Sequence, residues 1–568
     1  MCVTCYGAGS EVGRSCILVE ISGKRILLDS GVNIGTKNPS KRFPMLPNSQ
    51  PDVDLVLISH IHTDHLGSLP WLTEIKKCKA PIFMTTASYM LAPIMLRDFL
   101  NVTDDPPYNQ SQIDKCVSKI NYIEFYQHVN VNGINFVAYP AGHILGACAF
   151  HVTIQGRSFL YTGDFSSAAD HHLPGHMIPR LFPDVLITES TYGNKTREPM
   201  YNRERNFVQL VHKCVLSGGK VLIPVFAIGR LQEVCLMLND YWERIECKIP
   251  IYFASGIGAK ATEVYRRSVT WMNPTIQSGY FDYGKPTLAY SNVIKYDDTI
   301  PLEGPCVMVA TSGMLNAGKA YDLLINHHWY KDKKNMLIFT GYCGEGTLGR
   351  AILDRGNDNR VKFLNNKDNK DIDIIIQCQV TSVSFSAHAD QFEITSMIER
   401  LKPHNVITIH GDNNSVNELA NKIKKELKIP THVAKNKEPK NYPEMKMTKV
   451  AVDKDCIVNV DGVPSKFSGA IAQENNSGIN IQSLKKAADE HGAAFSRIHV
   501  KRRLNVNVSK EEVFKVLKNL NFIDENSEFN GDELPLQKFK IDFTDYGLVI
   551  EFDLKEKRNV DKFCVMLK

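Results

Sequence analysis

The stretch SHIHTDH, residues 59–65, directly follows an apolar run and decides how the chain is interpreted. Three histidines and one aspartate stand within six residues. Such side chains repel one another when protonated and waste core volume, so they are expected together only where a cation binds them. In an extended loop, alternate positions put His60 and His62 on one side. Asp64 and His65 turn toward another side, and the segment can therefore supply ligands to two metal ions.

Further ligand-type side chains follow other predicted strands. His143 lies in PAGHILGA, Asp164 in YTGDF and His410 in ITIHGD. A lone histidine is more often a core or surface residue than a ligand, and the chain has 18 histidines. The joint order of these residues carries the weight, because ligands at strand ends are what a site at a sheet edge requires. Asp29 and Glu189 also stand directly after short apolar runs.

Composition limits the classes of function only loosely. The 568 residues are 43% hydrophobic and 23% charged, which is typical of a soluble globular protein with several cores. A formal charge of +5 is too small to indicate nucleic-acid binding, so any RNA affinity must come from a local groove. We expect an intracellular protein, because the chain has neither a secretory signal nor about 18 consecutive apolar residues. Cys2 and Cys5 form one CxxC without a second pair, so a structural zinc ion is not expected there.

The distribution of motifs predicts the domain organisation. Short aliphatic runs, each followed by a loop or a helical segment, indicate a layered α/β protein. Residues 1–193 and 381–440 carry the ligand candidates, whereas residues 194–380 continue in the same style without a histidine cluster. We interpret the latter as an inserted domain. After a polar connector, residues 450–568 contain strand-like runs and one helical run, which predicts a small α+β module without visible chemistry.

The motifs together resemble a known family. HIHTDH, AGH, TGD and a distal histidine are similar to the metallo-β-lactamase superfamily. TEST before the insert, with SFSAHAD and HGD after it, resembles the β-CASP branch, whose members act on nucleic acids. The resemblance covers about residues 1–435 and implies a four-layer αββα fold with an inserted α/β β-CASP domain. Within that branch, GGKVLIPVFAIGR, YWERIECKIPIYF, ATSGMLNAG and KNMLIFTGYC are most similar to the Integrator-type endonucleases.

The resemblance implies two zinc ions with a shared set of ligands. One ion would be held by three histidines, the other by one aspartate and two histidines, and a second aspartate would bridge them. In this order, the residues are His60, His62, His143; Asp64, His65, His410; and Asp164. Two departures from the family's pattern concern neighbouring positions only: Asp412 stands where relatives usually have Glu, and Ser30 where relatives often have Cys.

The resemblance also implies roles for three residues outside the ligand set. Asp29 would orient a ligand histidine without itself binding a metal ion. His388 in SFSAHAD would be the general acid that protonates the leaving 3′ oxygen, and Glu189 would be its partner, raising the pKa of the imidazole. The alternative for both acids is an ordinary exposed carboxylate at a strand end.

Residues of the insert are candidates for RNA binding. Ser312 and Gly313 lie in a glycine-containing turn that could present backbone N–H groups to phosphate. Lys220, Arg230 and Lys319 lie near such turns and could line a groove. Ordinary turns and solvated surface cations are the alternatives.

The function that the resemblance implies is zinc-dependent cleavage of nascent RNA, leaving 5′-phosphate and 3′-hydroxyl ends. This includes small nuclear RNA 3′-end processing and promoter-proximal transcript cleavage in the nucleus, within an Integrator-type complex associated with RNA polymerase II. An inactive paralogous β-CASP subunit would bind residues 450–568, unless these form an RNA-binding appendage. The first alternative is the endonuclease of pre-mRNA cleavage and polyadenylation. The second is an inactive scaffold, but all seven ligand positions are filled. The third is a small-molecule hydrolase, which has no need of such an insert.

Overall fold

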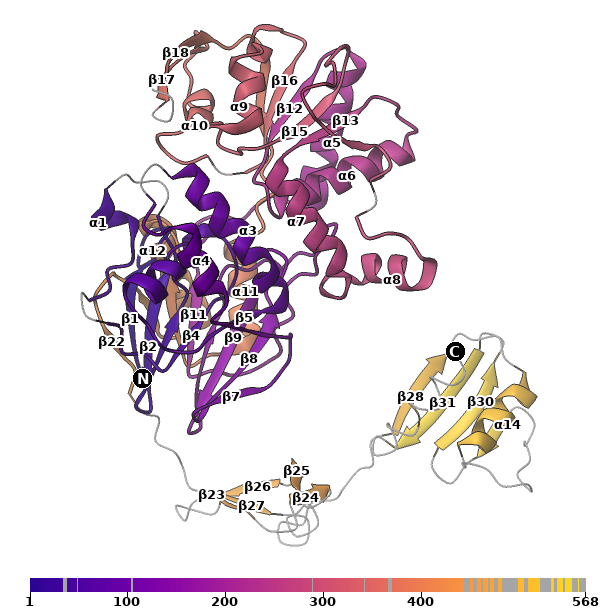
Figure 1. Cartoon of the computed structure of the whole chain (residues 1–568). Coiled ribbons are helices and arrows are strands. Elements are labelled where there is room, and N and C mark those ends of the chain that lie inside the picture. Colours follow the sequence, from indigo (N-terminus) through magenta and orange to yellow (C-terminus); the bar gives the residue numbers. More distant parts are fainter. Residues whose placement is uncertain are drawn as a thin grey trace. The chain divides into compact units, whose positions relative to one another are not determined.

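The computed structural model (Figure 1) describes most of the first 443 residues and parts of the rest. Residues 34–37, 48–49, 104–105, 289, 342 and 366–369 lie outside the description. Beyond residue 443 it covers 450–452, 457–460, 463–467, 470–473, 479–482, 499–504, 509–520, 533–535, 539–544, 547–553 and 560. The chain divides into two compact units, Met1–Glu444 and Met445–Lys568, which are described separately.

Two seven-stranded sheets form the centre of the first unit. Their strand orders are β22-β1-β2-β3-β4-β5-β6 and β21-β20-β11-β10-β9-β8-β7. The first sheet contains β1 (Cys2–Gly7), β2 (Cys16–Ile21), β3 (Lys24–Leu28), β4 (Leu55–Leu57), β5 (Ile82–Thr85), β6 (Ile120–Ile123) and β22 (Lys440–Asn441). The second contains β7 (Val129–Val131), β8 (Ile134–Pro140), β9 (Cys148–Ile154), β10 (Arg157–Tyr161), β11 (Val185–Glu189), β20 (Asn405–Ile409) and β21 (Thr431–Val433).

Alternation of apolar side chains explains why the sheets pack face to face. In β10, Phe159 and Tyr161 point into the core between the sheets, whereas Leu160 points to the opposite face. Strands β4 (LVL) and β11 (VLITE) are buried along their whole length, because both of their faces are covered. Helices cover the outer faces: α3 contacts β5 and β6, and α12 contacts β20 and β21. The expected four-layer αββα arrangement is confirmed.

The helices of this part are short apart from α3. They are α1 (Pro39–Arg42), α2 (Thr63–Leu66), η1 (Trp71–Ile75), α3 (Thr86–Val102), α4 (Gln110–Val117), α11 (Gln391–Leu401), α12 (Asn413–Lys422) and η4 (Ile423–Leu427). Asp390 caps α11 with a reciprocal bond to Glu393, an arrangement that fixes where the helix begins.

The insert contains a six-stranded parallel sheet of order β14-β13-β15-β12-β16-β19. Its strands are β12 (Val221–Pro224), β13 (Ile251–Ala254), β14 (Val293–Lys295), β15 (Val307–Ala310), β16 (Met336–Phe339) and β19 (Gln379–Ser382), and a hairpin of β17 (Arg360–Asn365) and β18 (Lys370–Ile375) is attached. Its helices are α5 (Met200–Leu216), α6 (Arg230–Arg244), α7 (Gly256–Arg267), η2 (Val269–Trp271), α8 (Pro274–Tyr283), α9 (Gly318–Ile325), η3 (Trp329–Lys331) and α10 (Leu348–Leu353). Side chains of α5 and α6 bury one face of the sheet, and those of α9 and α10 bury the other.

The second unit is α+β, as predicted. A four-stranded antiparallel sheet has the order β28-β31-β30-β29, from β28 (His499–Leu504), β29 (Glu533–Pro535), β30 (Phe539–Thr544) and β31 (Gly547–Asp553), with α14 (Lys510–Asn519). Smaller sheets contain β23 (Val450–Val452), β24 (Ile457–Val460), β25 (Val463–Phe467), β26 (Ala470–Gln473) and β27 (Ile479–Gln482). The rest of the predicted module 450–568 lies outside the described residues. Among described helices, none is long and apolar enough to cross a membrane.

Candidate metal centre

The ligand candidates meet at one edge of the two central sheets. His60 follows β4, Asp164 follows β10 and His410 follows β20, so each stands just beyond the carboxyl end of its strand. His62 is the residue before α2, and that helix carries Asp64 and His65. His143 follows β8 in a tight turn at Gly142. Four segments far apart in sequence, residues 60–65 and the ends of β8, β10 and β20, therefore place their polar side chains together.

The distances divide the candidates into two groups. Ligand atoms of His60, His62, His143 and Asp164 all lie within 4.8 Å of one another, as do those of Asp64, His65 and His410. Asp164 reaches both groups, because its Oδ2 lies 3.7 Å from His60 Nε2 and 3.4 Å from His65 Nε2. The division is the one expected for two neighbouring metal ions with Asp164 between them.

Asp29 orients one of the candidate ligands. It is fully buried and adopts a left-handed backbone, with φ of 60°. Its Oδ2 lies 2.7 Å from His65 Nδ1 and also accepts hydrogen bonds from the Ser59 hydroxyl at 2.7 Å and the Tyr161 hydroxyl at 2.5 Å. The Ser59 amide donates to Oδ1 at 2.6 Å. A carboxylate held in this way fixes the tautomer of the imidazole and leaves Nε2 free for a metal.

Three other histidines have an outer partner at Nδ1. The partner is the Ser59 hydroxyl at 3.0 Å for His60, the Ala387 carbonyl at 2.8 Å for His143 and the Thr191 hydroxyl at 3.2 Å for His410. Each ring therefore directs Nε2 toward the centre of the group. Ser59, Tyr161 and Thr191 were not predicted from the sequence as site residues. All three nevertheless lie within the motifs SHIHTDH, YTGDF and TEST.

The donor set fits zinc. Buried His60 Nε2 and Asp164 Oδ1 have no hydrogen-bond partner among the described residues, an arrangement that is costly unless something cationic binds there. Burial holds the pKa of His60 and His143 well below the usual value and lowers the pKa of His62 to about 4. These imidazoles are therefore neutral at physiological pH, the form that coordinates metal. Imidazole nitrogens with carboxylate oxygens are the ligands that zinc prefers.

His388 and Glu189 form a separate pair beside this centre. His388 Nδ1 lies 2.8 Å from Glu189 Oε2 and 3.7 Å from Asp164 Oδ2. Glu189 is itself fixed by the Phe165 amide at 2.7 Å and the Thr191 hydroxyl at 2.5 Å. Burial opposes protonation of His388, but Glu189 and Asp164 raise its pKa to about 9. The imidazolium is the form that can give up a proton.

Comparison with known proteins agrees with this geometry. The chain matches a metallo-beta-lactamase superfamily domain over residues 18–183, a Beta-Casp domain over 231–352 and a Zn-dependent metallo-hydrolase RNA specificity domain over 373–434. It is 34% identical to Integrator complex subunit 11 of Gallus gallus, over 92% of this chain and 88% of that protein. The chain belongs to the β-CASP metallo-hydrolase family.

Two further relatives illustrate the range of this β-CASP family. Integrator complex subunit 11 of Danio rerio is 38% identical, over 77% of this chain and 73% of the relative. Cleavage and polyadenylation specificity factor 73 of Drosophila melanogaster is also 38% identical, over 74% of this chain and 61% of the relative.

The structure places the RNA-binding candidates of the β-CASP domain at different ends of its sheet. Arg230 begins α6 beyond the carboxyl end of β12, pairs with Glu233 and lines a small recess together with Gly142 and Ala387. It therefore lies next to the metal centre. Lys220 precedes the same strand at its amino end, where its Nζ donates to the Leu302 carbonyl at 2.7 Å.

The remaining candidates follow β15. Ser312 donates from its hydroxyl to the Ala317 carbonyl at 3.0 Å, which closes the turn. Gly313 packs so closely on Phe226 that an added Cβ would lie 3.2 Å from the Phe226 nitrogen. Lys319 is paired with Asp298 and Asp322. The charge of Lys319 is thus compensated by two carboxylates. The turn at Ser312 and Gly313 lies beyond the carboxyl ends of the strands, as Arg230 does.

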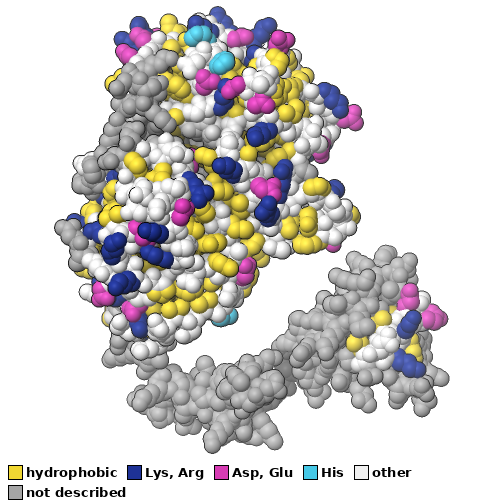
Figure 2. All heavy atoms as spheres, in the orientation of Figure 1, with side chains coloured by type: hydrophobic (Ala, Val, Ile, Leu, Met, Phe, Trp, Pro, Cys, Tyr) yellow, Lys and Arg dark blue, Asp and Glu magenta, His cyan; other side chains and the backbone are white. Residues whose placement is uncertain are grey.

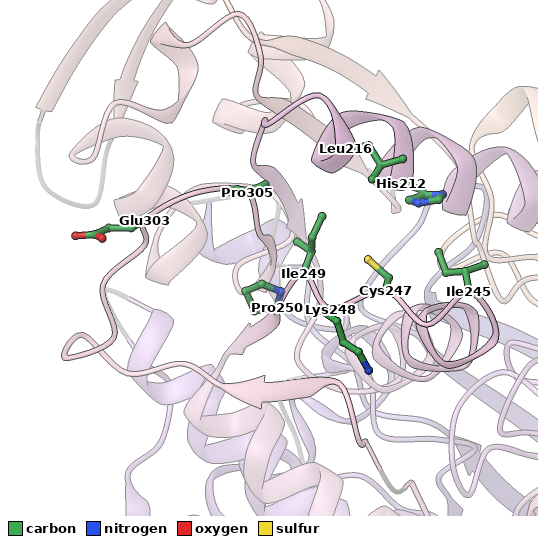
Figure 3. A pocket seen from close by; sticks show the side chains of 9 residues that line it. All are labelled: His212, Leu216, Ile245, Cys247, Lys248, Ile249, Pro250, Glu303 and Pro305. Atoms are coloured by element: carbon green, nitrogen blue, oxygen red, sulfur yellow. The ribbon is translucent and has the colours of Figure 1, made fainter.

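A pocket of about 580 Å³ opens near the amino ends of the β-CASP strands, at the opposite end of the sheet from Arg230 (Figure 3). It is lined by the end of α5, by residues 245–250 between α6 and β13, and by Glu303 and Pro305 before β15, and most of these side chains are apolar. No predicted ligand or catalytic residue lines it. The chemistry of the described residues is therefore concentrated at the metal centre and not at this cavity.

Proposed function

We propose that this β-CASP metallo-hydrolase is an endoribonuclease that uses two zinc ions held by the seven residues of the metal centre. The observation that carries the proposal is the His388–Glu189 pair, 3.7 Å from Asp164 but outside the ligand set. A hydrolase of small molecules needs neither the insert of residues 194–380 nor a proton donor on the segment that follows it. An inactive scaffold would not retain both the complete ligand set and the pair.

The residues divide the chemical work among them. Two zinc ions in such a site supply hydroxide near neutral pH and neutralise charge on the phosphate in the transition state. His388 donates a proton to the leaving 3′ oxygen, and Glu189 keeps its imidazole charged and correctly turned. Asp29 keeps the His65 ring in register. The products carry 5′-phosphate and 3′-hydroxyl ends.

The RNA would be bound locally. Figure 2 shows Lys and Arg side chains dispersed among acidic and apolar ones on the face in view, without a continuous basic surface. Arg230 and the turn at Ser312 and Gly313 lie beyond the carboxyl ends of the β-CASP strands. At this end of the sheet, Arg230 lines a recess together with Gly142 and Ala387, which neighbour His143 and His388. We assign phosphate binding to these residues in preference to Lys220 and Lys319.

A circular single-stranded RNA tests the reaction itself, because only an endonuclease can open a circle. We expect the zinc-loaded chain, in its native assembly, to linearise the RNA and to leave one 5′-phosphate and one 3′-hydroxyl. The ends are identified with a phosphate-dependent ligase. Conversion of linear RNA alone, or a 2′,3′-cyclic phosphate end, would contradict the proposed mechanism.

We further propose an Integrator-type assembly in the nucleus that acts on small nuclear RNA and nascent transcripts. Support comes from the two Integrator relatives, of which the Gallus gallus protein is similar over 92% of this chain and the Danio rerio protein is 38% identical. Pre-mRNA cleavage and polyadenylation is the second candidate because the Drosophila relative is a cleavage and polyadenylation factor at equal or higher identity. An inactive paralogous β-CASP subunit is the proposed partner of residues 450–568.

Purification of the tagged chain tests the assembly. We expect Integrator subunits, including the inactive paralogue, to co-purify with the full-length chain from nuclear extract. A variant that ends at residue 449 should keep normal zinc content, since every ligand candidate precedes that residue, but should lose the paralogue. Recovery of polyadenylation factors would select the second candidate. Full recovery of the paralogue with the shortened chain would show that residues 450–568 are not its binding site.

A further inference from the structure

The chain leaves the metallo-β-lactamase domain after β11 and re-enters it after β19, and the two connecting segments lie side by side. Tyr192 forms a parallel bridge with Asp390. Gln391 adds two bonds, from its amide to the Lys195 carbonyl at 3.0 Å and from its side chain to the Gly193 carbonyl at 2.7 Å. The returning segment carries His388, so its conformation decides where the proton donor stands.

Arg197 makes the largest set of contacts across this junction. Its guanidinium donates to the Ser386 carbonyl at 2.9 Å and to the His388 carbonyl, and its backbone amide donates to Asp390 Oδ2 at 2.8 Å. Glu393 Oε2 lies 3.6 Å from the same guanidinium. The guanidinium also lies 4.9 Å from the centre of the Tyr192 ring. A single side chain therefore binds the returning segment on both sides of Ala387.

The carbonyl between the two that Arg197 binds has a different partner. Ala387 accepts from His143 Nδ1 at 2.8 Å, and this bond directs His143 Nε2 toward the metal centre. Three successive carbonyls thus serve two tasks: the outer two are anchored to Arg197, and the middle one orients a candidate ligand. Displacement of this segment would disturb His388 and His143 together.

Other contacts hold the two ends of this segment: Arg203 donates to the Ser384 carbonyl, the Phe385 amide donates to the Thr340 carbonyl at 3.1 Å, and the Ala389 amide donates to the Phe165 carbonyl at 2.6 Å. Residues 383–389 form neither helix nor strand, so their carbonyls have no regular backbone ladder. The Arg197 side chain is only 14% exposed, and its Nε has no partner among the described residues. Burying a guanidinium is costly unless its bonds are well made. A buried arginine at this junction is therefore explained better by the carbonyls it binds than by contact with solvent.

We infer that Arg197 is a positioning residue, which holds residues 386–388 so that His388 stays on Glu189 and the Ala387 carbonyl stays on His143. The inference rests on the proposed function, because it assigns Arg197 a role through the proton donor. The contacts of Arg197 are with Ser386, His388, Asp390, Glu393 and Tyr192, and none of these is a candidate metal ligand. Its effect must therefore appear in the rate of the chemical step and not in RNA affinity.

The test compares Arg197→Met with Arg197→Lys in the assembled, zinc-saturated enzyme. We expect the methionine variant to lose on the order of 10²-fold in kcat with KM nearly unchanged, because a misplaced proton donor slows only the chemistry. The kcat of Arg197→Lys, which keeps the charge but cannot bind both carbonyls at once, should lie between that of the unmodified enzyme and that of Arg197→Met. Arg157→Met is the matched control: Arg157 also joins a carboxylate, Asp184 at 3.0 Å, to a carbonyl, that of Pro443 at 3.2 Å.

The decisive measurement is the double variant with His388→Ala. If Arg197 acts through His388, adding Arg197→Met to His388→Ala should cost less than about threefold at equal zinc content, since that interaction is already lost; the effect through His143 is measured separately, as lower zinc affinity of Arg197→Met. Multiplication of the two losses, a loss confined to KM, or an equal loss in Arg157→Met would overturn the inference. The outcome is separable from failure of the proposed function, because in that case the unmodified enzyme would not cut RNA at all.

Discussion

Replacing Asp164 with alanine should remove both bound zinc and RNA cleavage. Asp164 Oδ2 lies within 3.8 Å of His60, His65 and His143 nitrogens, and Oδ1 lies 3.3 Å from His410 Nδ1. Removal of this carboxylate leaves the histidines of both groups without their shared anion. We expect zinc content to fall from about two ions to less than one per chain, and cleavage to fall by more than about 10³-fold.

Elemental analysis of the purified chain, alongside the circular-RNA assay, checks this result. Asp184→Ala is the control, because Asp184 is also a buried carboxylate but binds Arg157 and the Ser158 amide away from the centre. This control should be destabilised yet keep its zinc. Two tightly held ions in Asp164→Ala would show that the aspartate does not bridge the two groups.

The second large effect is expected for His388→Ala, which should keep zinc but lose most cleavage. His388 binds Glu189 at 2.8 Å and lies 3.7 Å from Asp164, but it belongs to neither of the two ligand groups, so its removal leaves all seven candidate ligands in place. Loss of a general acid typically costs about 10²–10⁴-fold in rate. His404→Ala is the control, because this histidine lies half exposed near Asp184, outside the centre.

A substrate with sulfur in place of the leaving 3′ oxygen separates proton donation from a structural role. Sulfur leaves without protonation, so the His388→Ala variant should regain much of its rate on this RNA while the unmodified enzyme gains little. Absence of rescue, or loss of zinc from the variant, would argue that His388 supports the centre instead of donating a proton.

The fold and the ligand candidates could be predicted because their signals are local. Four ligand-type side chains within SHIHTDH, and single acids or histidines after apolar runs, are visible without knowing the fold. The contacts that complete the site are not local: Asp29 meets Tyr161 132 residues away, and Arg197 meets His388 191 residues away. The motifs identified Asp29 and His388, but only the folded chain shows that Tyr161 and Arg197 bind them.

The insert illustrates a different limit. Lys220 and Arg230 both flank β12 and were given the same expected role, yet they stand at opposite ends of the strand. In a parallel sheet, functional residues gather at the carboxyl ends, which favours the residue after the strand over the one before it. The pairing of Lys319 with Asp298 and Asp322 could not be foreseen, because Asp298 comes from a loop 21 residues earlier.

The pairing of β11 with β20 has a consequence for how the protein is made. The Ser190 hydroxyl bonds to the Ile409 carbonyl, 219 residues further along the chain, and His410 follows directly. A ribosome that adds about 5–20 residues per second needs roughly 10–45 s to span that distance. Until then the two central sheets lack β20, β21 and β22, and the metal centre lacks His410. The growing polypeptide therefore has no complete metal centre until residue 410 of 568 has been added.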